Sequence, residues 1–255
     1  MQTPVNTLKK ALQAGQVQHG IWLTSGTGVL AELSGKAGFD WCLIDGEHGP
    51  NTVSDILPQL QALAISDTPA VVRIANAEAW MVKQVLDLGC QTVLVPMVDD
   101  AETADMMARA MRYPPDGNRG MGAALARATG FGSVADYPIT ANSEVCLLAQ
   151  AESAQALDNI DDIAATDGVD GVFVGPADLS ADMGYPGQPD HPEVEKAIDH
   201  LIARIVAAGK IAGIITFDDA RFKEYAAKGV TFLGVGGDMM VLNKALNGLA
   251  AQVRS

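Results

Sequence analysis

Short apolar runs alternate with longer, mixed stretches along the whole chain. The apolar runs predict eight β-strands, at Gly20–Thr24, Trp41–Asp45, Ala70–Ile74, Thr92–Pro96, Val145–Gln150, Gly171–Gly175, Ala212–Thr216 and Phe232–Val235. Most of these runs are continuously apolar, which is typical of parallel strands that are covered on both faces.

The stretches between the runs have the apolar spacing of helices. We expect helices at Ala79–Leu88, Ala101–Arg112, Ala154–Thr166, Glu193–Ala208 and Asp219–Lys228. Several of them end in glycine, which favours a helix C-cap. Strand and helix alternate eight times, so the sequence predicts a single closed (β/α)₈ TIM barrel over residues 1–255 rather than an open sheet.

Two segments depart from the minimal barrel pattern. Thr3–Ala14 predicts an extra amphipathic helix that plugs the amino-terminal face of the barrel. Residues Tyr113–Asn142 form a long connection between the fourth and fifth strands. Connections of this length in compact domains tend to be functional.

Composition narrows the class of protein. Residues are 48% hydrophobic and 19% charged, which provides one sizeable core and argues against disorder. The net charge of −14 disfavours nucleic acid, because phosphate backbones repel an acidic surface. The chain shows no signal peptide or membrane-spanning stretch, and its three cysteines lack disulfide or metal spacing, so we expect a cytoplasmic protein.

Polar side chains stand where four of the predicted strands end. They are Asp45, Glu47 and His48 after the second strand, Arg73 in the third, Gln150 and Glu152 at the fifth, and Asp178 after the sixth. Active sites of (β/α)₈ barrels are built at this carboxyl-terminal edge. We therefore expect these groups to converge on one site.

Glu152 and Asp178 are the candidate metal ligands. Gln150 and Glu152 are two residues apart, so they point to the same side of their strand, and Asp178 follows the turn that ends the next one. Two carboxylates completed by water suit Mg²⁺ or Mn²⁺. In the structural alternative, Asp178 caps the next helix and Glu152 pairs with a surface lysine.

Asp45, His48 and Arg73 are the candidate catalytic residues. A carboxylate beside a histidine fixes its tautomer and raises its basicity, so Asp45 and His48 together predict a general base. In the structural alternative, His48 has no catalytic role, as is common for a single histidine after a strand. Arg73, at the end of an apolar strand, is placed to bind a carboxylate or an oxyanion. Its alternative role is a structural ion pair with Asp45 or Glu47, because a buried arginine needs a partner.

Other residues at this edge complete the candidate pocket. The turn formed by Gly175, Pro176, Ala177 and Asp178 has free backbone N–H groups that can bind a carboxylate. Trp22, at the end of the first strand, is either a pocket wall or core packing. None of the nine lysines falls at the carboxyl end of a predicted strand, which disfavours a Schiff-base mechanism.

Taken in chain order, these motifs resemble the HpcH/HpaI aldolase family. The resemblance is carried by Leu43–Gly49 (LIDGEHG), Val71–Arg73, Leu94–Val98, Tyr113–Pro115 with Arg119–Gly120, Ala149–Glu152 and Val172–Ser180 (VFVGPADLS). These segments extend over nearly the whole chain. The resemblance implies a TIM barrel of the phosphoenolpyruvate/pyruvate type.

The resemblance also implies roles for single residues. Glu152 and Asp178 would bind the divalent metal ion, which is Mg²⁺, Mn²⁺ or Co²⁺. Arg73 would bind the keto oxygen of pyruvate and stabilise the enolate. His48, oriented by Asp45, would move protons through water.

By the same resemblance, further residues would complete the site. Gln150 would contact substrate or a water on the metal, and the Gly175–Asp178 backbone would bind the pyruvate carboxylate. Trp22, Ile215 and the Tyr113–Asn142 connection would shape the aldehyde side.

The resemblance further implies a homo-oligomer. The relatives form hexamers as trimers of dimers and exchange the last helix, here around Met240–Val253. Asp87 matches an acidic residue that a neighbouring subunit provides at the mouth of the site.

The sequence thus predicts a class II aldolase that reversibly cleaves 4-hydroxy-2-oxo acids into pyruvate, or hydroxypyruvate, and an aldehyde. The cation acts as a Lewis acid, and Arg73 adds positive charge at the enolate oxygen. One alternative is a citrate-lyase-type enzyme for thioesters, but no basic cluster for coenzyme A is found. Another is a non-catalytic protein that binds 2-oxo acids, which the Asp45–His48 pair disfavours because binding alone needs no base.

Overall fold

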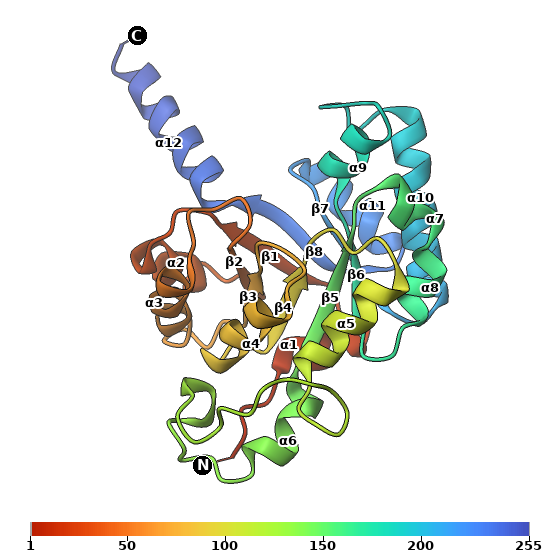
Figure 1. Cartoon of the computed structure of the whole chain (residues 1–255). Helices are drawn as coiled ribbons and strands as arrows, with labels where there is room; N and C mark the ends of the chain where they lie inside the picture. Colours follow the sequence, from red (N-terminus) through yellow and green to blue (C-terminus); the bar gives the residue numbers. More distant parts are fainter. Residues whose placement is uncertain (1, 255) are drawn as a thin grey trace.

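Eight parallel strands close into a barrel in the computed structural model, which describes residues 2–254 (Figure 1). The strands are β1 (Gln18–Leu23), β2 (Trp41–Asp45), β3 (Ala70–Arg73), β4 (Thr92–Val95), β5 (Cys146–Ala151), β6 (Gly171–Val174), β7 (Ile211–Ile215) and β8 (Val230–Gly237). Each strand pairs with the next one along the chain, and β8 closes the barrel against β1. The predicted (β/α)₈ barrel is confirmed.

Helices lie between successive strands and cover most of the outside of the barrel, while one further helix lies at each end of the chain (Figure 1). They are α1 (Thr7–Gln13), α2 (Gly28–Gly35), α3 (Val53–Leu63), α4 (Ala79–Asp87), α5 (Ala101–Met111), α6 (Tyr137–Glu144), α7 (Ala154–Asp158), α8 (Ile160–Ala165), α9 (Pro176–Asp182), α10 (Pro192–Ala207), α11 (Phe222–Ala227) and α12 (Asp238–Gln252), with 3₁₀ turns η1 (Arg127–Thr129) and η2 (Asp219–Arg221). The helix predicted at Ala154–Thr166 is interrupted at Asn159. The side chain of Asn159 donates to the carbonyl of Asp99 at 2.8 Å, which holds this residue outside helical geometry.

Helix α1 closes the amino-terminal end of the barrel, as predicted. It begins later than expected because the Asn6 side chain caps it by accepting a hydrogen bond from the N–H of Lys9 at 2.9 Å. Leu8 and Leu12 are buried and belong to the apolar cluster inside the barrel. The helix is therefore part of the core.

The apolar core lies on both sides of the barrel wall, which explains why the strands are continuously apolar. Along β2, Trp41 and Leu43 belong to the cluster that fills the barrel. Cys42 and Ile44 belong to the cluster beneath the surrounding helices. Inside the barrel the ring of Trp41 stacks on Phe232 with 4.0 Å between centroids.

The long connection between β4 and β5 lies at the amino-terminal end of the barrel, near the start of the chain (Figure 1). It contains η1 and α6 and has a small apolar cluster of its own, formed by Tyr113, Ala128, Val134, Tyr137 and Ala141. The expectation that residues 113–142 shape the aldehyde side is therefore wrong for the cavity of the same chain, because none of these residues lines it. The catalytic edge is the opposite end of the barrel.

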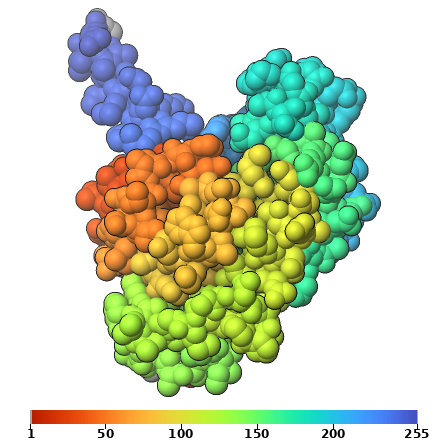
Figure 2. Space-filling model, in the orientation of Figure 1, coloured from red at the N-terminus to blue at the C-terminus, as the bar shows by residue number. Residues whose placement is uncertain are grey.

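Helix α12 extends away from the body of its own chain (Figures 1 and 2). Its apolar residues are exposed, including Leu246 at 57% and Leu249 at 60%. The alternative that this apolar stripe covers its own barrel is excluded by these exposures. Among residues 2–254, no helix has the length and apolar character needed to cross a membrane.

Candidate active site

A cavity of about 330 Å³ lies at the carboxyl-terminal ends of the strands. Its lining includes the predicted residues Trp22, His48, Arg73, Gln150, Gly175, Pro176, Ala177, Asp178 and Ile215. Thr24, Phe173, Phe217, Gly237 and Met240 complete the lining. The fold therefore brings together side chains that lie more than 200 positions apart in the sequence.

Arg73 is the fixed cation of this cavity. Its Nε and Nη2 atoms donate to the two carboxylate oxygens of Asp45 at 2.9 and 2.7 Å, and Nη1 lies 2.8 Å from Oε2 of Glu47. Burial by itself lowers the pKa of Arg73, but the hydrogen bonds to Asp45 and the negative charges of Asp45, Glu47 and Glu152 raise the pKa above its usual value. The predicted ion pair is present, and Arg73 lines the cavity as well.

The predicted contact between Asp45 and the imidazole of His48 is wrong. The Asp45 carboxylate is occupied by Arg73 and also accepts the backbone N–H groups of Glu47, at 3.1 Å, and His48, at 3.3 Å. The His48 side chain is 65% exposed, and its Nε2 atom lies 3.9 Å from Oε2 of Glu47. Asp45 therefore holds the turn that carries His48, and Glu47 is the carboxylate near the ring.

Glu47 is a site residue to which the sequence reasoning gave no catalytic role. It is placed between the cation Arg73 and the ring of His48. Burial raises its pKa, Arg73 and His48 oppose this effect, and the charges of Asp45 and Asp178 add to it. Its position in the same short run as Asp45 and His48 was the available signal.

Glu152 is almost completely buried, at 2% exposure, beside the cavity. Its Oε1 atom accepts the backbone N–H of Met97 at 2.9 Å, and its Oε2 atom accepts a hydrogen bond from Nε2 of Gln150. Burial raises the pKa of Glu152 to about 7, with the charges of Asp178 and Glu47 adding to this effect. A cation at this position would stabilise the ionised carboxylate.

The surroundings of Glu152 fit a hard divalent cation. A Cβ atom on Gly175 would lie 2.3 Å from Oε2 of Glu152, so any side chain at this position would fill the space beside the carboxylate oxygen. Gln150 Oε1 is buried and has no hydrogen-bond partner. Mg²⁺ and Mn²⁺ prefer such oxygen donors, often with only one or two protein carboxylates and several waters.

Asp178 is the second candidate ligand and lies in the first turn of α9. It is exposed, and its charge acts on both Glu152 and Glu47. Within residues 2–254, no three His, Cys, Asp or Glu side chains form a ready metal-binding group. Glu152 and Asp178 therefore supply at most two ligands, and the remaining ones come from amide oxygens, substrate or water.

The backbone donors of the turn after β6 are fewer than predicted. The N–H of Gly175 donates to the carbonyl of Ala151 at 3.2 Å, and Pro176 has no N–H. Ala177 and Asp178 follow in the first turn of α9, where N–H groups have no partner within the helix. A substrate carboxylate would therefore meet the N–H groups of these two residues.

The cavity wall is apolar on the side of Trp22. The Trp22 ring is 6% exposed and lies 5.5 Å from the Trp41 ring and 5.6 Å from the Phe173 ring, measured between centroids. Trp22 is thus both wall and core packing. Met240, from the first turn of α12, completes this wall, and its place far along the chain left no local signal.

Asp87 does not line the cavity of its own chain. It ends α4, and its Oδ1 atom accepts a hydrogen bond from Nη2 of Arg119 at 2.6 Å. Because helices run back against the strands, the end of α4 lies toward the amino-terminal face of the barrel. Asp87 can therefore reach such a cavity only in another copy of the chain.

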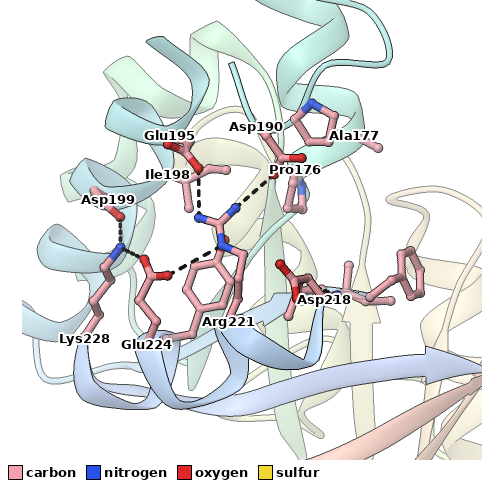
Figure 3. Close-up of a pocket in the computed structure, with 15 residues that line it drawn as sticks. Pro176, Ala177, Asp190, Glu195, Ile198, Asp199, Asp218, Arg221, Glu224 and Lys228 are labelled. Atoms are coloured by element: carbon pink, nitrogen blue, oxygen red, sulfur yellow. Dashed lines mark hydrogen bonds and ion pairs between the residues drawn. The ribbon is translucent and has the colours of Figure 1, made fainter. Parts of the chain in front are cut away.

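A second cavity of about 740 Å³ shares Pro176, Ala177, Ile215 and Phe217 with the first (Figure 3). Its two cations are already paired. Arg221 contacts Asp190 at 3.0 Å and Glu195 at 3.1 Å, and Lys228 contacts Asp199 at 2.7 Å. The larger cavity lacks the Arg73, Gln150 and Asp178 group, so we identify the smaller cavity as the candidate active site.

Comparisons with known proteins place the chain among relatives. Residues 18–245 match the family model described as HpcH/HpaI aldolase/citrate lyase. The chain is 52% identical to a hydroxypyruvate/pyruvate aldolase of Agrobacterium fabrum over 254 residues, covering 100% of this chain and 96% of the relative. It is 48% identical to a 2-keto-3-deoxy-L-rhamnonate aldolase of Salmonella gallinarum, covering 98% and 94%.

A solved structure has the same architecture. It is a HpcH/HpaI aldolase/citrate lyase family protein from Burkholderia cenocepacia, with a TM-score of 0.94 and 39% sequence identity. The match covers 98% of this chain and 100% of that one. The similarity thus extends over the whole barrel.

Proposed function

The chain belongs to the HpcH/HpaI aldolase/citrate lyase family and is a carbon–carbon lyase, and on this premise we propose a metal-dependent aldolase. Its reaction is the reversible cleavage of a 4-hydroxy-2-oxo acid into pyruvate, or hydroxypyruvate, and an aldehyde. The observation that carries this proposal is the placement of the Arg73 cation and Gln150 in the lining of one cavity, with the buried Glu152 carboxylate hydrogen-bonded to Gln150 beside it.

Glu152 and Asp178 would hold the divalent cation, which is Mg²⁺, Mn²⁺ or Co²⁺. A cation bound there polarises the carbonyl of a 2-oxo acid and makes the adjacent C–H protons more acidic. Three features of the chain support this assignment. They are the raised pKa of Glu152, the Gln150 side-chain oxygen that has no hydrogen-bond partner, and the space beside Oε2 of Glu152 that a side chain at Gly175 would fill.

Arg73 would stabilise the negative charge that develops on the keto oxygen. Its guanidinium is held by Asp45 and Glu47 before substrate arrives, so little reorganisation is needed during the reaction. The N–H groups of Ala177 and Asp178 would bind the carboxylate of the same molecule. These contacts would fix the adjacent carboxylate and keto groups of the 2-oxo acid.

His48 would move the proton at the carbon atom that becomes nucleophilic, through a water molecule. Its imidazole is exposed to the cavity, and the nearby Glu47 carboxylate would stabilise the protonated ring. Among residues 2–254, no lysine lines this cavity, so a covalent imine has no candidate residue here.

The aldehyde would bind on the apolar side, against Trp22, Ile215 and Met240. Asp87 of another copy would complete the mouth of the site, which requires an oligomer. We propose a hexamer built as a trimer of dimers, in which α12 packs on a partner. The exposed apolar face of α12 supports this assembly.

Exchange of the methyl protons of pyruvate with deuterium oxide tests the function directly. The aldolase should catalyse exchange only when Mg²⁺, Mn²⁺ or Co²⁺ is present, because exchange reports enolate formation without an acceptor aldehyde. If the protein binds pyruvate and metal but the NMR signal of the pyruvate methyl group keeps its intensity, the protein is a binding protein instead. Cleavage of a thioester without pyruvate exchange would identify a citrate-lyase-type enzyme.

A further inference from the structure

A buried amide side chain closes the turn that follows β2. Nδ2 of Asn51 donates to the carbonyl of Asp45 at 2.7 Å and to the carbonyl of Leu23 at 3.3 Å. These carbonyls lie at the carboxyl ends of two neighbouring strands, β2 and β1. Asn51, which is 7% exposed, therefore joins two strand ends at the catalytic edge of the barrel.

The turn between Asp45 and Asn51 is held from both of its ends. The Asp45 carboxylate accepts the N–H groups of Glu47 and His48, and Asn51 binds the Asp45 carbonyl. The chain packs closely around this amide, since a Cβ atom on Gly49 would lie 2.7 Å from Nδ2 of Asn51. The position of Glu47 and His48 thus depends on Asn51.

Asn51 is in turn held by Gln59, on the inner face of α3. Nε2 of Gln59 donates to Oδ1 of Asn51 at 2.6 Å and to the carbonyl of Asp55 at 2.9 Å. The first bond fixes the orientation of the Asn51 amide, because only its oxygen accepts a hydrogen bond. Nδ2 is therefore directed at the two strand-end carbonyls.

Gln59 is a costly residue for structure alone. It is 0% exposed, its Oε1 atom has no hydrogen-bond partner, and its neighbours Ile56, Leu60 and Leu63 belong to the apolar core. A buried polar atom without a partner is destabilising, so an apolar residue would be favoured at this position if the side chain had no polar group to hold. The amide is better explained by its bond to Asn51.

We propose that Asn51, oriented by Gln59, is a positioning residue that fixes Glu47 and His48 for proton transfer. This inference rests on the proposed aldolase function of the same site. The hydrogen bonds that link Gln59, Asn51 and Asp45 determine where the turn places the side chains of Glu47 and His48. Residues that orient active-site groups typically change activity by roughly 10–100-fold when they are replaced.

The test compares two Gln→Met substitutions on the same helix. Gln59→Met removes the bond to Asn51 while keeping the size of the side chain, and Gln61→Met is the control, because Gln61 is exposed on α3. In the pyruvate exchange assay, Gln59→Met should lower kcat roughly 10–100-fold with little change in KM. Its melting temperature should fall modestly, because Oδ1 of Asn51 stays buried without its partner, and Gln61→Met should match the wild type in kcat and in melting temperature.

A purely structural role predicts a lower melting temperature with a normal kcat for folded Gln59→Met, and that normal kcat would overturn the inference. If Gln59→Met does not fold, Asn51→Ser provides the test, because it leaves the packing of α3 intact. A normal kcat for folded Asn51→Ser would contradict the proposal equally.

The His48 imidazole signal in NMR, assigned with His48→Asn, separates this inference from the function itself. Gln59→Met should shift that signal without substrate present, and Gln61→Met should not. An unshifted signal in Gln59→Met would refute the positioning role. If Gln59→Met shifts the signal but the wild-type protein exchanges no pyruvate protons, the positioning role is supported and the aldolase function is refuted.

Discussion

Arg73 and Asp45 face each other across β2 and β3 as register partners, and their side chains form two parallel hydrogen bonds of 2.9 and 2.7 Å. Both residues are buried, at 7% and 1% exposure. This two-point contact fixes the plane of the guanidinium, which a single-point ion pair would leave free to rotate. The pair thus serves both the stability of the barrel and the electrostatics of the cavity.

Substitution of Arg73 should reduce turnover strongly. Arg73→Ala should lower kcat about 10²–10³-fold, or roughly 3–4 kcal/mol in the barrier, because a preorganised donor at the enolate oxygen is lost. Arg73→Lys keeps the charge but not the planar fork, so it should recover only part of the activity. Steady-state kinetics of cleavage and of pyruvate exchange measure both effects.

Stability must be measured alongside this change, because Arg73→Ala leaves Asp45 buried without its cation. Breaking a buried pair costs about 3–5 kcal/mol, so the melting temperature should fall as well. The double variant Arg73→Ala with Asp45→Asn should regain part of the stability but not of kcat. A folded Arg73→Ala protein with a normal kcat would remove Arg73 from the mechanism.

Removal of divalent metal should abolish activity. Treatment with a chelator should stop cleavage, and Mg²⁺, Mn²⁺ or Co²⁺ should restore it, because in the proposed site Glu152 and Asp178 would hold the catalytic cation. Glu152→Gln should weaken metal binding in calorimetry, whereas Glu32→Gln on α2, whose side chain is 44% exposed, should not. Full activity in thoroughly metal-free protein would exclude this metal site.

The C-terminal helix should hold copies of the chain together. Val241, Leu242, Leu246 and Leu249 of α12 are all at least 36% exposed, an apolar surface that water disfavours. Leu246→Asp should therefore shift the protein to smaller species, measured by light scattering at micromolar concentration, while Asn247→Asp on the same helix should not. A wild-type mass near the 26.6 kDa of one chain would rule out the oligomer.

The three cysteines should be unreactive in the folded protein. Burial raises the pKa of Cys42 and of Cys90 to about 12, and that of Cys146 well above its usual value. Thiolates are the reactive form, so a thiol reagent at pH 8 should label none of them before denaturant is added. Rapid labelling of the native protein would show that a thiol is accessible.

The same shifts predict how stability depends on pH. Because the folded pKa lies above the unfolded one, the protonated thiol favours the folded state below about pH 8.5, and this stability is lost as pH rises toward 12. Each thiol contributes a slope of about 1.4 kcal/mol per pH unit in that range. Urea unfolding at pH 8 and pH 10 should show a smaller decrease for Cys90→Ala than for the wild type.

The sequence by itself determined the barrel fold and most of the residues that line its cavity. Parallel strands buried on both faces must be apolar throughout, so all eight were visible as apolar runs. Since all their carboxyl ends meet at one edge, the polar residues found there, such as Arg73 and Gln150, had to face a common space.

Only the tertiary structure decided which of these groups contact each other. In the sequence Asp45 and His48 are three residues apart, but the register of β2 and β3 places Asp45 opposite Arg73, and the guanidinium takes the carboxylate. Two further contacts also join segments that are distant in the chain. The N–H of Met97 donates to the Glu152 carboxylate, and Met240 lines the cavity. Local patterns report which side of a strand a residue occupies, whereas partners across strands depend on strand register and helix docking, which the packing of the whole chain sets.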